Sequence, residues 1–367
     1  MKLNAKTGLA LSIIPQIIFV KWFGAYPELV EKYYSEGIYP IISKFLRLLF
    51  GWVPFSMGDI FYTLIGVAII RYIYLKAKSF RKKPKRLLLH LGYTLSIAYF
   101  IFHLFWGMNY YRLPVNEKLG FEVEYTKEEL VNFSLGMISF TNHLQMQISK
   151  DSLQPVNIPY SNKEIYHKTL ESYEAATKKA FPNFEYETPS LKSSLYSTPL
   201  TYMGYGGYLN PFTNEAQVNA LIPKLRLPSV SGHEVGHQLG YSSESSTNFI
   251  GLVVTYSNPD RYFKYAALTH ILAYCLSDLK EKDEAAFEMV MTKLNEGVKK
   301  NYRELTAFWE QYQNPTEPIF KSIFNTFLKA NNQEEGIQSY NAVVGLLINT
   351  DKNYWYTLYR NESYLQK

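Results

Sequence analysis

Hydrophobic and polar residues follow two different patterns along this chain of 367 residues. Residues 8–23, 55–74 and 87–108 are apolar runs, and the second and third are each long enough to cross the core of a lipid bilayer. The first run is shorter and contains a proline and a lysine, and no small-x-small cleavage site follows it. The pattern predicts three transmembrane helices, of which the first is an uncleaved anchor.

The segment between the first two runs has a mixed pattern. Residues 37–55 combine bulky apolar residues with Lys44 and Arg47 at near-helical spacing. This pattern is typical of an amphipathic helix that lies in the membrane interface. A helix that packs on the next domain outside the membrane would show the same pattern, so both interpretations stay open.

After residue 108 the pattern becomes that of a folded domain. Thr126 and Ser161 are N-cap residues with acids in the turn that follows, and both predict helices. Residues 191–223 are rich in Tyr, Thr, Gly and Pro with short alternating runs, which predicts a few short strands, and helical patterns return after residue 244. We expect an α+β fold, with a membrane anchor over residues 1–108 (three transmembrane helices and an interfacial helix) and a mostly helical domain with a small sheet over residues 109–367.

Charge is segregated along the chain. Residues 1–106 carry 14 Lys and Arg against 4 Asp and Glu, a net charge of +10, whereas the remainder carries 24 against 28, a net charge of −4. Most of this excess lies between the second and third runs in a segment without acids, which contains Arg71, Lys76, Lys78, Arg81, Lys82, Lys83, Lys85 and Arg86. The positive-inside rule keeps this segment in the cytoplasm and places the residues after about 108 on the other side of the membrane.

These observations predict a multi-pass protein of the cell inner membrane whose C-terminal domain is extracytoplasmic and whose partners include membrane lipid. A nucleic-acid partner is not expected, because the basic residues do not cluster on the folded domain. The sequence leaves the oligomeric state open.

The strongest chemical signal is an H-E-x-x-H motif at His233, Glu234 and His237. On a helix, two histidines four residues apart share one face and can bind one metal ion, while the glutamate beside the first can accept a proton from a metal-bound water. The motif predicts Zn²⁺ as cofactor, His233 and His237 as its ligands and Glu234 as the catalytic residue. The five other histidines stand singly and are expected to be packed or surface residues.

A hydrolytic zinc site usually has three protein ligands and one open position for water. The sixth residue after the second histidine is Ser243, a poor ligand, and Glu244 follows it. A left-handed Gly240 would end the motif helix and let the next helix present Glu244 to the metal, so we expect Glu244 as the third metal ligand. A first-turn acid stabilised by the helix dipole would look the same. Asn248, one turn on, either hydrogen-bonds a ligand imidazole or has no role at the site.

At this point the chain resembles a known group of proteins. The stretches HEVGHQLGY, ExxTN, GYGGYLNPFTNEAQVNALIP and WGMNYYRLP, together with YYSEGIYP and GWVPFSMGD, resemble an uncharacterised bacterial membrane-protein family known only as a domain of unknown function. The resemblance covers nearly the whole chain and implies three N-terminal membrane helices followed by a gluzincin-like zinc metallopeptidase domain. Glu244 matches the acid ligand of the gluzincin pattern E-x-x-A-D/N. The family's second acid and its alanine are replaced by Ser246 and Thr247.

Together the motif and the resemblance predict a membrane-anchored zinc metallopeptidase that acts on a peptide or protein. The alternative is a non-catalytic zincin-like domain that binds peptides or cell-envelope partners. An intramembrane protease is disfavoured, because the residues around the motif are too polar for a membrane span.

Two further features concern the substrate. Residues 214–223 alternate like an edge strand that could hold an extended peptide, although a strand packed beneath the motif helix would alternate in the same way. Glu215, within this segment, is either a site residue or an acid in a turn. Tyr205, Tyr208 and Tyr340 are candidates to stabilise an oxyanion, because tyrosine hydroxyls suit that role.

Overall fold

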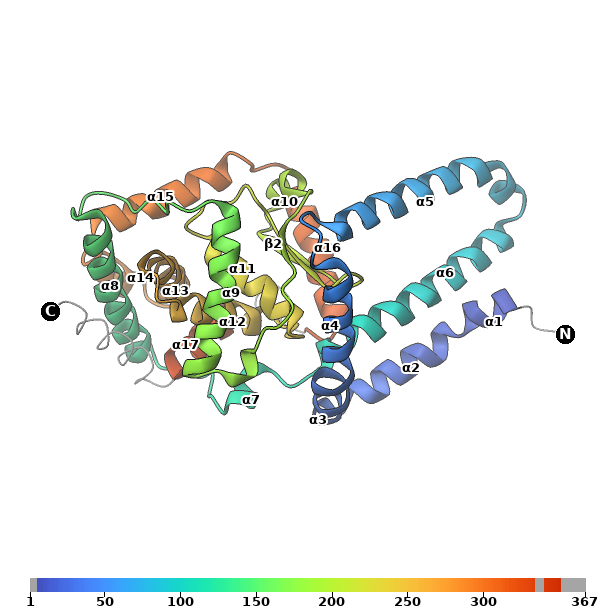
Figure 1. Ribbon diagram of the computed structural model, residues 1–367, viewed down its shortest axis with the longest axis horizontal. Coiled ribbons are helices and arrows are strands. Elements are labelled where there is room, and N and C mark those ends of the chain that lie inside the picture. Colours follow the sequence, from blue (N-terminus) through green and yellow to red (C-terminus); the bar gives the residue numbers. More distant parts are fainter. Residues whose placement is uncertain (1–4, 334–339, 351–367) are drawn as a thin grey trace.

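The computed structural model describes residues 5–333 and 340–350, and their side chains except at positions 78–81, 340 and 341. Helices surround a small three-stranded sheet, and long apolar helices project from one end of this body (Figure 1). The α+β fold predicted from the sequence is confirmed.

Three of the helical segments are long and apolar enough to cross a membrane. The first combines α1 (Ala5–Leu11) and α2 (Ile13–Gly24), and the others are α5 (Met57–Lys82) and α6 (Pro84–Phe105). The rest of the molecule buries at most 11% of their apolar windows, so these helices expose their side chains. Figure 1 shows α5 and α6 diverging from their connection towards the body. The three predicted apolar helices are confirmed, although α6 ends three residues before residue 108.

The segment between α2 and α5 contains α3 (Pro27–Leu29), the π-helical η1 (Val30–Ile38) and α4 (Tyr39–Phe50). One face of α4 packs on the body, and the hydroxyl of buried Tyr39 donates to the carbonyl of Gln238 at 2.8 Å. The opposite face exposes apolar residues to the surroundings. The predicted helix is therefore amphipathic: one face packs on the body, and the outer face is apolar and exposed.

The remaining helices form the body and its core. Their bounds are η2 (Gly107–Tyr111), α7 (Val115–Leu119), α8 (Lys127–Ser149), α9 (Asn162–Lys179), η3 (Pro182–Phe184), α10 (Ser197–Met203), α11 (Leu227–Gln238), α12 (Glu244–Ser257), α13 (Arg261–Lys282), α14 (Glu284–Met291), α15 (Glu296–Glu310), α16 (Glu317–Ala330) and α17 (Tyr340–Asn349). The predicted N-caps at Thr126 and Ser161 are confirmed, each as a capping box. Helices α12 and α13 are largely buried and lie at the centre of the main hydrophobic core.

The sheet has the strand order β1-β3-β2. Strand β3 (Glu215–Val218) pairs in parallel with β1 (Leu191–Ser193) and antiparallel with β2 (Gly207–Asn210). The short strands predicted within residues 191–223 are confirmed, but β3 is the central strand, so the edge-strand interpretation of residues 214–223 is wrong. Every residue of β3 is buried, and the polar residues that suggested a solvent-facing side are buried partners of other polar groups.

Candidate metal centre

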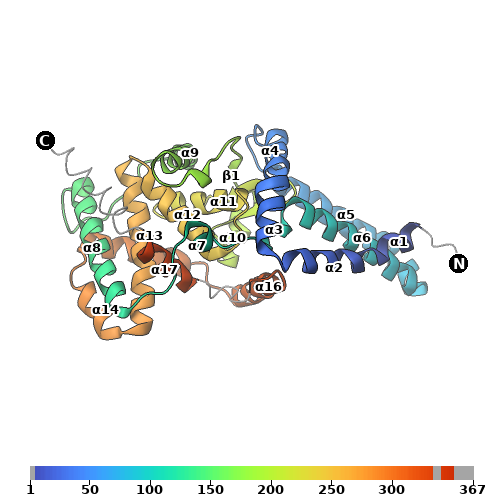
Figure 2. The same ribbon diagram turned by 90° about the horizontal axis from the view of Figure 1, so that it is seen from below.

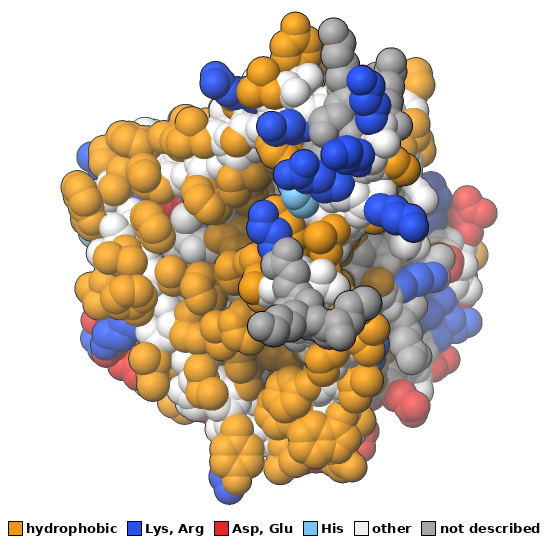
Figure 3. All heavy atoms as spheres, turned by 90° about the vertical axis from the view of Figure 1, so that its right-hand side faces the viewer, with side chains coloured by type: hydrophobic (Ala, Val, Ile, Leu, Met, Phe, Trp, Pro, Cys, Tyr) orange, Lys and Arg blue, Asp and Glu red, His pale blue; other side chains and the backbone are white. Residues whose placement is uncertain are grey.

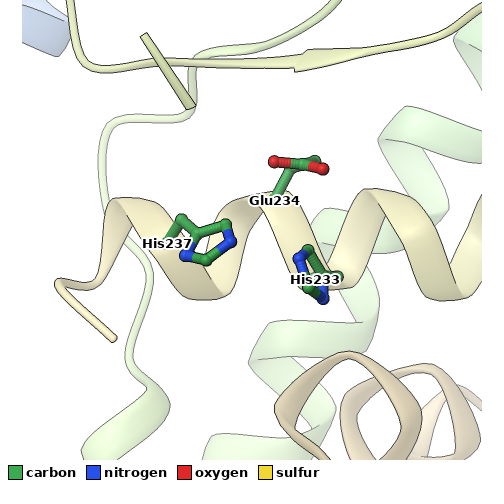
Figure 4. Close-up of side chains that lie close together, drawn as sticks. All are labelled: His233, Glu234 and His237. Carbon is green, nitrogen blue, oxygen red and sulfur yellow. The ribbon is translucent and has the colours of Figure 1, made fainter. Parts of the chain in front are cut away.

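The H-E-x-x-H motif occupies the second half of α11. His233 and His237 lie on one side of the helix with their ring centroids 4.7 Å apart, while the carboxylate of Glu234 points towards the neighbouring strand (Figure 4). Candidate ligand atoms of the three residues all lie within 4.8 Å of one another. The helical spacing thus brings together the three side chains that the sequence predicted.

The chain turns sharply after α11. Gly240 has a φ of +86°, and the amides of Gly240 and Tyr241 donate to the carbonyls of His237 and Gly236 at 2.9 and 3.2 Å. This pair of hydrogen bonds is a Schellman motif, which favours glycine at the left-handed position. The left-handed turn predicted at Gly240 is confirmed, and it reverses the chain towards α12.

Helix α12 places Glu244 at the imidazole pair. Ser243 caps the helix, and Glu244 is its first residue. The carboxylate oxygens of Glu244 lie 3.4 Å from Nε2 of His233 and 3.8 Å from Nε2 of His237. A tetrahedral Zn²⁺ with bonds of about 2.0–2.2 Å holds its ligand atoms roughly 3.3–3.6 Å apart. The separation from His233 falls within this range and that from His237 lies just above it, so the three residues come close to the spacing of a tetrahedral metal site.

Glycines allow α11 and α12 to approach closely enough for this arrangement. A Cβ on Gly251 would lie 2.7 Å from the carbonyl oxygen of Ser229 and 2.8 Å from the amide of His233. A Cβ on Gly232 would lie 3.1 Å from the Cα of Gly251. Since the backbones meet without intervening side chains, Glu244 reaches the motif face from the first turn of α12.

The outer nitrogens of both imidazoles have fixed partners. Nδ1 of His233 lies 2.9 Å from Oδ1 of Asn248, and Nδ1 of His237 lies 2.8 Å from the carbonyl oxygen of Tyr241. Because both partners are acceptors, each Nδ1 carries the proton and each Nε2 presents a lone pair. The contact expected between Asn248 and an imidazole is confirmed, and both Nε2 atoms are ready to bind a metal.

Burial sets the protonation of this cluster. It lowers the pKa of His233, with a contribution from His237, and lowers the pKa of His237 to about 4. Burial together with Glu244 raises the pKa of Glu234, and burial raises the pKa of Glu244 to about 7. Oε2 of Glu234 is buried without a hydrogen-bond partner, and no Lys or Arg in the described ranges pairs with either carboxylate.

Two neutral imidazoles, the buried carboxylate of Glu234 and the carboxylate of Glu244, whose side chain is 15% exposed, form a site that lacks positive charge. A divalent cation supplies that charge, and a donor set of two nitrogens and one or two oxygens suits Zn²⁺. The residues present therefore fit the metal predicted from the motif.

Of the three candidate tyrosines, Tyr205 lies near the site, because burial together with Glu244 raises the pKa of its hydroxyl. The hydroxyl of Tyr208 donates to Asp59, and that of Tyr205 donates to the carbonyl of Phe320 at 3.2 Å. Tyr340 begins α17, but its side chain lies outside the described residues. None of them is placed by a described contact where it would stabilise an oxyanion.

The sequence did not reveal that residues after α6 support the site. Nε1 of Trp106 donates to the carbonyl of His237 at 3.1 Å, and its ring lies edge-on to that imidazole with centroids 6.0 Å apart. Tyr110 is buried, and burial together with Glu244 raises its pKa. Both residues belong to the stretch WGMNYYRLP noted for its resemblance, but a separation of about 130 residues gives no periodic signal of contact.

Strand β2 borders the site from the sheet. It is an edge strand, and a Cβ on Gly207 would lie 2.6 Å from Oε1 of Glu234. Only glycine leaves room there for the carboxylate. The edge next to the motif is thus formed by β2 and not by residues 214–223.

Comparisons with known proteins give one family. A family model described as "Protein of unknown function (DUF3810)" matches residues 34–348, which include all four predicted site residues. No curated protein and no solved structure matches the chain. The predicted resemblance to an uncharacterised family is confirmed by this match, whose description gives no activity.

Proposed function

Because the chain belongs to the DUF3810 family of proteins of unknown function, we infer its activity from the site and propose a membrane-anchored, zinc-dependent metallopeptidase that hydrolyses peptide bonds. One observation carries the proposal: Nε2 of His233, Nε2 of His237 and the Glu244 carboxylate converge at distances of 3.4 and 3.8 Å, as in a gluzincin-like ligand set. Glu234 stands beside them without a cationic partner among the described residues.

Each residue has a distinct part in the proposed reaction. Zn²⁺ held by His233, His237 and Glu244 would lower the pKa of a bound water towards 7 and polarise the scissile carbonyl. Oε2 of Glu234 is free to accept a proton from the attacking water and to return it to the leaving amine. Burial and the neighbouring Glu244 raise the pKa of Glu234, which favours its holding the proton that it takes from the water.

The outer edge of β2 is the proposed substrate-binding edge. An extended peptide that pairs with this edge gains backbone hydrogen bonds without depending on its sequence. Since Gly207 of β2 touches the Glu234 carboxylate, a peptide on this edge passes directly over the catalytic residue.

We place the site on the extracytoplasmic side of the inner membrane. The basic residues between α5 and α6 support this orientation through the positive-inside rule. In this orientation, all three spans meet the body at the outer face of the membrane.

The test uses the full chain in detergent or liposomes. We expect about one Zn²⁺ per chain and cleavage within a broad peptide library, with Glu234→Gln lowering the cleavage rate roughly 10²–10⁴-fold while zinc stays bound. Bound zinc without cleavage, and no difference between the wild type and Glu234→Gln, would overturn the peptidase and leave a non-catalytic domain that binds peptides or cell-envelope partners.

A further inference from the structure

Helix α16 carries an apolar stripe that the protein does not cover. Four residues on one face of the helix have exposed fractions between 37% and 61%: Ile319, Phe320, Ile323 and Phe327. Another side of the same helix packs inward, where Leu328 is 1% exposed. A continuous exposed apolar stripe marks a surface with a partner.

The position of α16 indicates what covers this stripe. The ring of Phe327 lies 6.2 Å from that of Phe102, which is one turn before the end of the third span. Leu328 belongs to the same core cluster as Val20 near the end of the first span. Figures 1 and 2 show α16 beside the junction of the spans with the body. The helix therefore lies at the level where the spans leave the membrane.

Exposed aromatic residues mark the same level around the molecule. Trp22 and Tyr26 at the end of the first span are 58% and 47% exposed, and Trp52 after α4 is 78% exposed. Tryptophan and tyrosine in such positions are typical of the boundary between lipid and water. Figure 3 shows the molecule from the end at which the spans project. Hydrophobic side chains cover most of this view, and Lys and Arg gather in one part of it, near the tip of the spans. The stripe on α16 thus continues a surface that the spans place in lipid.

The same helix also reaches the metal centre. The carbonyl of Phe320 accepts from Tyr205, and the ring of Phe327 lies 6.0 Å from that of Tyr110. Trp106, the first residue after the third span, contacts His237 directly. One tryptophan side chain therefore separates the end of a span from a predicted metal ligand. The headgroup layer is roughly 5–7 Å thick on each side of the bilayer core, so the site lies close to it.

We propose that the apolar stripe of α16 is seated in the outer interface of the lipid bilayer, and that the metal centre takes peptides held at that surface by their own lipid or transmembrane anchor. The membrane seat follows from the positions of α16 and the spans, whereas the substrate class rests on the proposed peptidase function. Free soluble peptides reach the same site only by diffusion to the surface, without the enrichment that an anchor gives.

The seat is tested with nitroxide labels in the full chain, reconstituted in liposomes of phosphatidylethanolamine and phosphatidylglycerol. Ile323→Cys samples the stripe, and Ser322→Cys is a matched exposed position on the polar side of the same helix. The native Cys275 is buried and does not compete for the label. We expect the label at 323 to be more accessible to oxygen than to a water-soluble nickel chelate, and the label at 322 to show the reverse. Equal nickel access at both positions overturns the seat.

The substrate class is tested in the same liposomes with one peptide library offered in two forms, free and coupled to a lipid anchor. We expect faster cleavage of the anchored form, by at least about tenfold, and no preference after transfer of the enzyme and the peptides to detergent. Equal rates in liposomes overturn the substrate class. If neither form is cleaved, the proposed peptidase function and the substrate class fall together, while the nitroxide labels still decide the membrane seat.

Discussion

Two groups of buried carboxylates differ in how their charge is balanced. At the junction between the sheet and the second span, Glu215 is fully buried and pairs with Nζ of Lys192 at 2.5 Å. It also accepts from the amides of Met57 and Gly58 at the start of α5 and from the hydroxyl of Thr213. Glu215 therefore begins strand β3 instead of lying in a turn, and its charge is compensated within the protein.

The metal centre lacks this compensation. Glu244 faces two imidazoles that burial keeps neutral, and Glu234 lies beside them on the same helix. Neither carboxylate pairs with Lys or Arg in the described part of the chain. A buried carboxylate without a counter-charge is unstable unless a proton or a cation joins it. The balance of charge therefore distinguishes a structural acid from one placed to bind a ligand.

The largest effect is expected when the acid at the junction is removed. Glu215→Ala leaves Lys192, which is 6% exposed, without its carboxylate partner, and we expect a loss of about 3–5 kcal/mol in unfolding free energy. Denaturant unfolding of the full chain in detergent measures it. As a control, Glu187→Ala removes an exposed salt bridge to Lys44 and should change stability little. Unchanged stability of Glu215→Ala would mean that the junction is not structural.

Local features of the fold were predictable from sequence, whereas contacts across the chain were not. The capping boxes at Thr126 and Ser161, the apolar spans and the left-handed Gly240 each depend on a few adjacent residues, and all appeared as expected. The order of the strands depends on partners far away, which explains why residues 214–223 were assigned to an edge. In the same way, the helical patterns after residue 244 predicted helices but not that one of them, α16, lies beside the spans.

The residues of the site were likewise predictable where they are close in sequence and not where they are distant. His233, Glu234 and His237 come from one helix and were predicted by their spacing, and Glu244 was reached through the turn at Gly240. The support from Trp106 was not predictable, because hydrophobic periodicity shows which face of a helix is buried but not which distant segment buries it.

The unfolding free energy measured at a series of pH values distinguishes the carboxylates of the metal centre from Glu215 at the junction. The folded-state pKa of Glu244 is about 7 against an ordinary value of 4.5, so its proton is held more tightly in the folded chain. Its contribution to stability is full below pH 4.5 and is lost as the pH rises to 7, a change of about 3 kcal/mol. The raised pKa of Glu234 acts in the same direction, and the lowered pKa values of His233 and His237 act in the opposite one.

Because these groups act in opposite directions, the contribution of Glu244 is measured as a difference in unfolding free energy between two variants. In metal-free protein, we expect the stability of the wild type minus that of Glu244→Gln to fall between pH 4.5 and 7. Saturating Zn²⁺ should stabilise the wild type most at the upper end of this range, because it replaces the proton with a stronger partner. A difference that stays flat with pH would show that Glu244 titrates as an ordinary exposed acid.

Removing the third ligand sharpens the contrast with the junction. Glu244→Ala should lower zinc affinity by more than the roughly 10–100-fold that loss of an outer partner costs, since a direct ligand is removed. In contrast to Glu215→Ala, it should not destabilise the metal-free chain at pH 7, because it deletes a buried charge that has no cationic partner. Competition with a fluorescent chelator measures affinity, and unfolding without metal measures stability. Unchanged zinc affinity would remove Glu244 from the ligand set.

The smallest expected effect concerns the residue that orients an imidazole. Asn248→Ala removes the acceptor 2.9 Å from Nδ1 of His233 and should weaken zinc binding roughly 10–100-fold, because the ring loses its fixed tautomer and angle. Asn248→Asp keeps an acceptor at this position and should retain most of the affinity. Ser245→Ala on the same helix serves as a control, because the hydroxyl of Ser245 lies 2.7 Å from that of Ser243 and not at an imidazole. If Asn248→Ala and Asn248→Asp bind zinc equally, the hydrogen bond does not orient the ligand. His233 would then be held by the packing of α11 on α12 alone.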